Sequence, residues 1–114
     1  TVMNARIEFI KNKKELTLPI IKLTKSRNGK TGTATFIFIQ PSLFISTNFK
    51  INSINGMYLL WENDKIETKD IEVFFKDGNP YLIKALLIFK NSKEWFHFFK
   101  FMNYYSKETG LSFN

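Results

Sequence analysis

Two dense turn signals constrain the fold of this chain more than any other feature of its sequence. Asn28-Gly29 and Asp77-Gly78-Asn79-Pro80 are rich in residues that suit the tight turns of β-hairpins. Each lies between two segments that have the residue pattern of strands: the segment before each turn alternates, and the segment after it is apolar or rich in β-branched and aromatic residues. The sequence therefore predicts an antiparallel β-sheet built of hairpins.

The alternating segments are short and are bounded by Gly, Pro, Asn or Ser. We expect strands at 6–11, 20–27, 33–40, 56–62, 66–76 and 81–90, a loop at 11–15, a turn at 63–65 and an irregular stretch at 42–55. The 81–90 segment is apolar on both faces, with Leu82, Leu86 and Ile88 on the second one. Such a strand is usually central and covered on both sides, so we expect a layer on each face of it.

The C-terminal region has the periodicity of a helix. Its core stripe follows the i, i+3, i+4, i+7 rule: Trp95, Phe98, Phe99, Met102 and Tyr105. Asn91 and Glu94 form a variant capping box, Ser92 is an alternative cap, and Gly110 is the expected stop. The sequence thus predicts an α+β fold in which a long C-terminal helix packs on the sheet, within a single domain, 1–114.

Three aromatic residues of this helix fall off the core stripe: Phe96, Phe101 and Tyr104. Either a second layer covers them or they form an exposed contact patch. We expect the 42–55 segment or the termini to cover them.

Positive charge is concentrated near the N-terminus. The net charge is +7, and residues 1–35 hold eight cations against two acids. Part of the lysine excess reflects a bias towards residues with AT-rich codons, so total charge alone does not identify a partner. Around the first turn, however, cations and hydroxyls gather into a candidate partner-binding set: Lys22, Lys25, Arg27, Asn28, Lys30, Thr31 and Thr33.

A solvated turn explains any single lysine of this set. The whole cluster is equally well explained as a binding surface for nucleic acid, anionic lipid or an acidic protein surface. Residues 20–33 contain one Arg and no aromatic residue, which disfavours nucleic acid. A small basic nucleic-acid-binding domain nevertheless stays as the alternative function.

Few side chains point to catalysis, and we expect no enzyme, no metal and no cofactor. The chain has no Cys, one His (His97) and no nucleophile elbow, and most of its acidic residues stand beside a Lys. Gly29-Lys30-Thr31 ends like a phosphate-binding loop, but Thr24 replaces the glycine that this loop requires, and a strand follows instead of a helix. No apolar stretch is long enough to span a membrane, and we expect no targeting leader.

Taken together, several motifs resemble one known family. They are residues 23–36, Gln40-Pro41, Gly56-Met57-Tyr58, then Trp95, Phe98, Phe101, Met102 and Tyr105, and finally Gly110-Leu111-Ser112-Phe113. In this order they closely resemble the photosystem II reaction-centre W protein family, also called the photosystem II 13 kDa protein family. The resemblance covers nearly the whole chain, and its 23–36 stretch is highly specific.

The resemblance implies a non-enzymatic assembly factor that is peripheral to the thylakoid membrane, on its cytosolic or stromal side, in a plastid or a cyanobacterium. The implied partners are photosystem II assembly intermediates that contain the inner-antenna subunit and reaction-centre core subunits. It also implies that a C-terminal segment of the inner antenna extends the sheet by β-augmentation. Anionic thylakoid lipid is a further expected partner, and no nucleic acid is expected.

Overall fold

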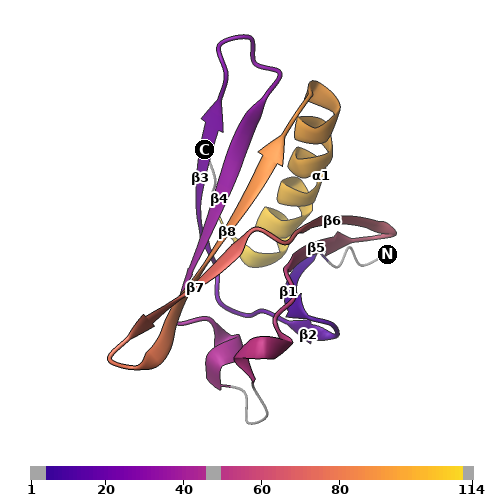
Figure 1. Ribbon diagram of the computed structural model, residues 1–114. Coiled ribbons are helices and arrows are strands. Elements are labelled where there is room, and N and C mark those ends of the chain that lie inside the picture. The colour runs from indigo at the N-terminus through magenta and orange to yellow at the C-terminus, as the bar shows by residue number, and fades with distance from the viewer. Residues whose placement is uncertain (1–4, 46–49, 112–114) are drawn as a thin grey trace.

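The computed structural model describes residues 5–45 and 50–111. Within these ranges the chain forms two four-stranded antiparallel sheets, two short 3-10 helices and one α-helix (Figure 1). The α+β fold expected from the sequence is therefore confirmed. Residues 46–49 of the expected irregular stretch, and Ser112 and Phe113 of the last motif, lie outside the described residues.

We call the two sheets the small sheet and the large sheet. The small sheet has the strand order β2 (Lys13–Lys14), β1 (Arg6–Ile10), β5 (Met57–Trp61) and β6 (Asp64–Thr68). The large sheet has the order β3 (Ile20–Lys25), β4 (Gly32–Ile39), β8 (Asn79–Phe89) and β7 (Ile71–Lys76). The remaining elements are the 3-10 helices η1 (Ser42–Ile45) and η2 (Ile51–Ser53) and the helix α1 (Ser92–Thr109).

Both turn signals produce hairpins of the large sheet, as expected. In the first, Gly29 has a φ of 71°, and its N–H donates to the Ser26 carbonyl at 3.0 Å. In the second, Asp77 and Gly78 both have positive φ, 53° and 83°, as two-residue hairpin turns require. Asn79 and Pro80 already belong to β8, so this turn is shorter than the sequence suggested.

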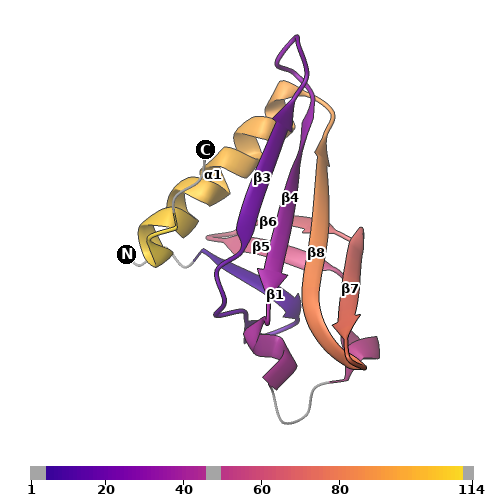
Figure 2. The same ribbon diagram turned by 90° about the vertical axis from the view of Figure 1, so that its left-hand side faces the viewer.

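The core lies where α1 packs against both sheets. On the large-sheet side, the ring centroids of Phe98 and Phe89 are 4.9 Å apart. On the small-sheet side, those of Phe101 and Trp61 are 5.5 Å apart. Figure 2 shows the large sheet nearest the viewer, with the small sheet behind it and α1 along one side. One helix thus buries two of its faces, which explains why it carries so many aromatic residues.

Three local expectations were wrong. The expected 11–15 loop contains the short strand β2. The turn after β5 is Glu62-Asn63 rather than 63–65, and Glu62 takes a φ of 48°. The expected 66–76 strand divides into β6 and β7, which belong to different sheets. At the break, Asp70 N–H donates to Thr68 Oγ1 at 3.0 Å, and Thr68 Oγ1–H donates to the Leu86 carbonyl at 2.8 Å.

The expected cover over the second face of β8 is absent among the described residues. The strand is an interior one, as predicted, but Ile88 is 60% exposed on that face. Leu82 and Leu86 on the same face are half-buried, and the sheet's opposite face packs on the helix and the small sheet.

The three off-stripe aromatic residues of α1 have different environments. Phe101 is fully buried, but by Trp61 of the small sheet rather than by the 42–55 segment. Tyr104 is half-buried, and a hydrogen bond from its hydroxyl to Glu62 raises the pKa of Tyr104 above its ordinary value. Phe96 is 75% exposed, so the expectation that it is covered was wrong.

None of the helices in the described part of the chain is both long and apolar enough to span a membrane.

Candidate partner-binding surface

We call residues 22–33 the basic hairpin, because they contain all seven residues of the predicted partner-binding set. The structure places these residues on the end of β3, the turn and the start of β4, and leaves Lys22, Lys25, Arg27 and Lys30 exposed. None of these four cations forms an ion pair with another described residue. Their charge is therefore available to an anionic partner.

The sequence grouped these cations together, but the strand geometry separates some of them. Lys22 and Lys25 are three residues apart on β3, so their side chains leave opposite faces of the sheet. Lys25 lies towards the turn, because a Cβ added to Gly29 would come within 3.3 Å of Lys25 Cε. The basic hairpin therefore presents charge around its tip rather than on one flat face.

Several of its polar groups organise the turn instead of facing a partner. Asn28 Oδ1 accepts hydrogen bonds from Lys30 N–H at 2.9 Å and from Ser26 Oγ–H at 2.6 Å. The Ser26 hydroxyl also accepts from Thr31 N–H at 3.2 Å, and the hydroxyls of Thr24 and Thr33 bond to each other. The predicted partner-binding set does not include Ser26, although the hydroxyl of Ser26 makes two hydrogen bonds within the turn. Asn28 and Thr33 are therefore better described as supports of the surface.

The edge of the large sheet lies directly beside this hairpin. β3 is an outer strand of the sheet, and Ser26 N–H donates to the Thr31 carbonyl at 2.9 Å. Because main-chain bonds alternate in direction along an antiparallel strand, the N–H and C=O groups of Ile21, Leu23 and Lys25 point away from β4. These groups are available for pairing with another strand.

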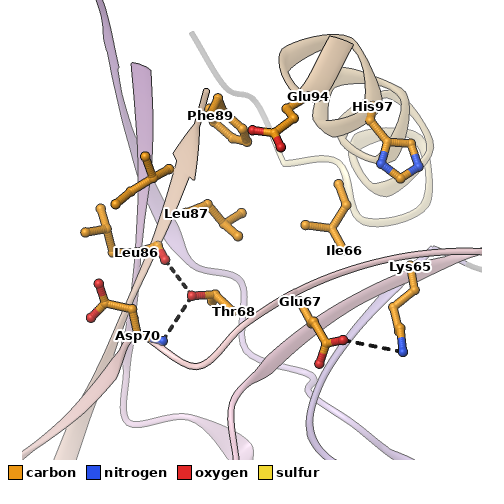
Figure 3. A pocket seen from close by; sticks show the side chains of 11 residues that line it. Lys65, Ile66, Glu67, Thr68, Asp70, Leu86, Leu87, Phe89, Glu94 and His97 are labelled. Atoms are coloured by element: carbon orange, nitrogen blue, oxygen red, sulfur yellow. Dashed lines mark hydrogen bonds and ion pairs between the residues drawn. The ribbon is translucent and has the colours of Figure 1, made fainter. Parts of the chain in front are cut away.

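A second concave region lies between β6, β8 and the first turns of α1 (Figure 3). This cleft has a volume of about 370 Å³, and Ile66, Leu87 and Phe89 supply its apolar lining. It exists because the β7–β8 pairing reaches only as far as Ile71 and Ala85, which leaves the end of β8 without a partner strand on that side. Local sequence patterns carried no signal for it, since its walls come from both sheets.

Most of the ionisable groups that line the cleft already have partners. Glu94 Oε1 accepts a hydrogen bond from Lys90 N–H at 2.6 Å, and Glu67 pairs with Lys65 at 3.6 Å. His97 Nε2 lies 3.6 Å from Asp64 Oδ1, and the His97 ring lies 4.8 Å from that of Trp61. Across residues 5–45 and 50–111, no group of three acidic or His side chains is placed to hold a metal ion.

Comparison with known proteins provides an independent observation. A family described as "Psb28 protein" matches residues 7–113 of the chain. The chain is 41% identical to the photosystem II reaction center Psb28 protein of Phaeodactylum tricornutum, over 98% of this chain and 97% of that protein. It is also 41% identical to the protein of the same name from Cyanidioschyzon merolae, over 96% of each chain. It is 40% identical to the chloroplastic PSB28 protein of Arabidopsis thaliana, over 94% of this chain and 58% of that protein.

Proposed function

Because this chain belongs to the Psb28 family of photosystem II proteins, we propose that it is a non-enzymatic factor in the assembly of photosystem II. The family is called Psb28, which differs from the name reaction-centre W protein suggested by the sequence motifs. Its members include chloroplastic and cyanobacterial proteins and do not form a known enzyme family. Family membership is the observation that carries the proposal.

The proposed site of action is the cytosolic or stromal face of the thylakoid membrane, where the protein binds as a peripheral component. Its proposed partners are immature photosystem II complexes that contain the inner-antenna subunit and reaction-centre core subunits. The unpaired cations of the basic hairpin support binding to an anionic protein surface.

We propose that the free edge of β3 supplies the second part of this contact. An extended segment of the inner-antenna subunit would add a strand beside β3 and bond to the outward main-chain groups of Ile21, Leu23 and Lys25. The basic hairpin adjoins this edge, so charge and strand pairing would act on the same partner. Main-chain hydrogen bonds would give affinity, and the hairpin charges would select the partner.

A charge-reversal experiment tests the role of the hairpin. Lys25→Glu combined with Arg27→Glu should weaken co-migration with immature photosystem II in native gels of thylakoid extracts, while the far-ultraviolet circular dichroism stays unchanged. The matched control is Lys11→Glu with Lys14→Glu, which changes the net charge equally at two exposed sites, one in the turn after β1 and one in β2. Equal co-migration of wild type and hairpin variant would show that the hairpin is not the contact.

The same assay tests the strand edge. Leu23→Pro removes an outward N–H from β3, which an edge strand tolerates better than a central one. Val73→Pro is the matched control, because β7 is the opposite edge and both side chains are half-buried. We expect the Leu23 variant, and not the Val73 variant, to lose co-migration while both stay folded. The reverse result would place strand addition at β7 and contradict the proposed edge.

A further inference from the structure

The outward face of α1 carries a regular row of lysines that the partner-binding proposal does not use. Lys93, Lys100 and Lys107 recur every seven residues, with Phe96 and Asn103 between them. All five side chains are exposed. We call these five residues the helix stripe.

The seven-residue spacing places the lysines nearly in line. Seven residues are close to two turns of an α-helix, or about 10.5 Å along its axis, so the row extends about 21 Å. The helix turns its other side to the two sheets, and Figure 1 shows it on the outside of the molecule. The stripe is thus a straight, accessible line of positive charge.

No carboxylate of the described residues forms an ion pair with this row. Of the two acidic residues in α1, Glu94 lines both the cleft beside β6 and the groove beside the stripe, but its Oε1 accepts a hydrogen bond from Lys90 N–H. Glu108 is turned about 100° around the helix from Lys107. The stripe therefore keeps the charge of three lysines on one narrow face.

Phe96 makes this face more than a solvated polar surface. It is 75% exposed, although the neighbouring Trp95 and Phe98 are buried. Lys93 stands one turn before it and Lys100 one turn after it, since residues three and four apart share a helix face. A shallow groove of about 680 Å³ beside it is lined by the half-buried ring of Phe99. An exposed aromatic ring between cations suits the boundary between lipid headgroups and acyl chains.

We propose that the helix stripe docks on an anionic lipid surface, with Phe96 inserted at the headgroup boundary and the three lysines among the headgroups. This inference rests on the proposed function, which places the protein at the thylakoid membrane. A lipid surface fits better than nucleic acid, because the stripe has no Arg and only one aromatic ring with which to stack on bases.

The arrangement of the molecule agrees with this docking. The tip of the basic hairpin and the start of α1 lie at the same end of the fold (Figure 1). A Cβ added to Gly32 would collide with the Trp95 ring, so the base of the hairpin contacts the first turn of the helix. The edge of β3 belongs to the large sheet and the stripe to α1, so strand pairing and lipid contact would use different elements.

Vesicle flotation with the purified protein tests the proposal. Wild type should float with vesicles of phosphatidylglycerol and phosphatidylcholine at low salt, and not with vesicles of phosphatidylcholine alone. Neutralising the row with Lys93→Gln, Lys100→Gln and Lys107→Gln should lower the partition coefficient about fivefold per lysine, because each lysine contributes about 1 kcal/mol near an anionic surface. Phe96→Ser should weaken binding with the charge unchanged.

Matched controls distinguish an effect of the stripe from a general effect of net charge or of exposed apolar side chains. Lys11→Gln, Lys14→Gln and Lys50→Gln remove the same charge from exposed sites elsewhere, and Ile88→Ser removes an exposed apolar side chain from the large sheet. Both controls should float better than their stripe counterparts. Equal losses in the two triple variants would overturn the proposal, as would the absence of any flotation with anionic vesicles.

The assay contains only protein and lipid, so it does not depend on photosystem II. A wild-type protein that co-migrates with photosystem II but does not float with anionic vesicles would contradict lipid docking and leave the assembly function standing. Conversely, flotation by a protein that does not co-migrate would support the stripe and contradict the proposed assembly function. The two proposals can therefore fail separately.

Discussion

At the scale of single residues, Gly32 decides how closely α1 approaches the large sheet. A Cβ at this position would collide with the Thr24 carbonyl oxygen and with the Trp95 ring. The Trp95 indole N–H is buried and has no hydrogen-bond partner among the described residues, so packing holds this ring in place. A glycine is needed here for close approach rather than for a left-handed backbone.

The first prediction follows from this contact. Gly32→Ala should lower the free energy of unfolding by about 1–3 kcal/mol, the usual cost of overpacking a core. Urea denaturation followed by tryptophan fluorescence measures it. Thr35→Ala, on the outer face of the same strand, is the control and should change stability much less. An unchanged urea midpoint for the Gly32 variant would show that α1 can shift without cost.

Glu15 is a residue whose role the sequence did not reveal. It lies in a stretch predicted as a polar loop, yet it is 5% exposed. Its carboxylate accepts hydrogen bonds from the N–H groups of Thr17, Ser42 and Leu43 and from the Ser42 hydroxyl. Burial and, to a smaller extent, the charge of Glu15 raise the pKa of Tyr105 well above its ordinary value. The carboxylate thus fixes the start of η1 to the segment before β3.

At the scale of elements, α1 begins where its capping residues place it. Asn91 Oδ1 accepts a hydrogen bond from Glu94 N–H at 2.9 Å, and Glu94 in turn accepts from Lys90 N–H. Asn91 is therefore the N-cap, and the alternative cap, Ser92, is the first residue of the helix. At the other end, Gly110 takes a φ of 77° and its N–H donates to the Ser106 carbonyl, as the sequence predicted.

This cap gives a prediction for the element. Asn91→Ala should cost about 1 kcal/mol of stability, because it leaves an N–H of the first turn without its acceptor. Ser92→Ala should have an effect within about 0.5 kcal/mol, as expected for a surface position that makes no cap. Thermal denaturation followed by circular dichroism measures both. Equal losses for the two variants would contradict the assignment of the cap.

The prediction of a single strand over 66–76 failed at the same scale, because the segment forms two strands, β6 and β7. Ile71, Val73 and Phe75 alternate with other residues in the 66–76 segment, whereas Ile66 is out of phase with them. Alternation reports only that one face of a strand is buried. It does not report which sheet provides the burial. At the break between β6 and β7, the Thr68 hydroxyl donates to the Leu86 carbonyl and the Leu86 N–H donates to the Asp70 carbonyl, although Leu86 is distant in sequence. Only the tertiary fold brings these groups together.

At the scale of the whole molecule, α1 joins the two sheets through opposite sides of its buried surface. Phe98 contacts Phe36 and Phe89 of the large sheet, and Phe101 contacts Trp61 of the small sheet. Because both sheets share this helix as a core element, we predict that they unfold together. The single domain, 1–114, expected from the sequence stays a prediction until that is measured.

Phe101→Ala provides the measurement. Truncating this fully buried ring should lower the free energy of unfolding by about 3–5 kcal/mol, while urea transitions followed by tryptophan fluorescence and by circular dichroism still coincide. Phe96→Ala is the control on the same helix and should be nearly neutral, because Phe96 is 75% exposed. Two separate transitions in wild type would mean that the sheets are independent units.

The sequence by itself determined the local features of this protein. Turn residues determined the two hairpins of the large sheet, and apolar periodicity and caps determined α1. The specific motifs identified a photosystem II family, under a name other than Psb28. Each of these signals is local, because turns, caps and helix faces are set by residues within a few positions of one another. The clustering of cations in the basic hairpin is a local sequence signal as well.

The tertiary structure decided how these elements share surfaces. It divided one alternating segment between two sheets, buried Phe101 and left Phe96 exposed, although all three aromatic residues off the stripe looked alike in sequence. It also left the edge of β3 and the outward row of lysines on α1 accessible. Burial and exposure depend on contacts between residues far apart in the chain, which periodicity within one segment does not encode.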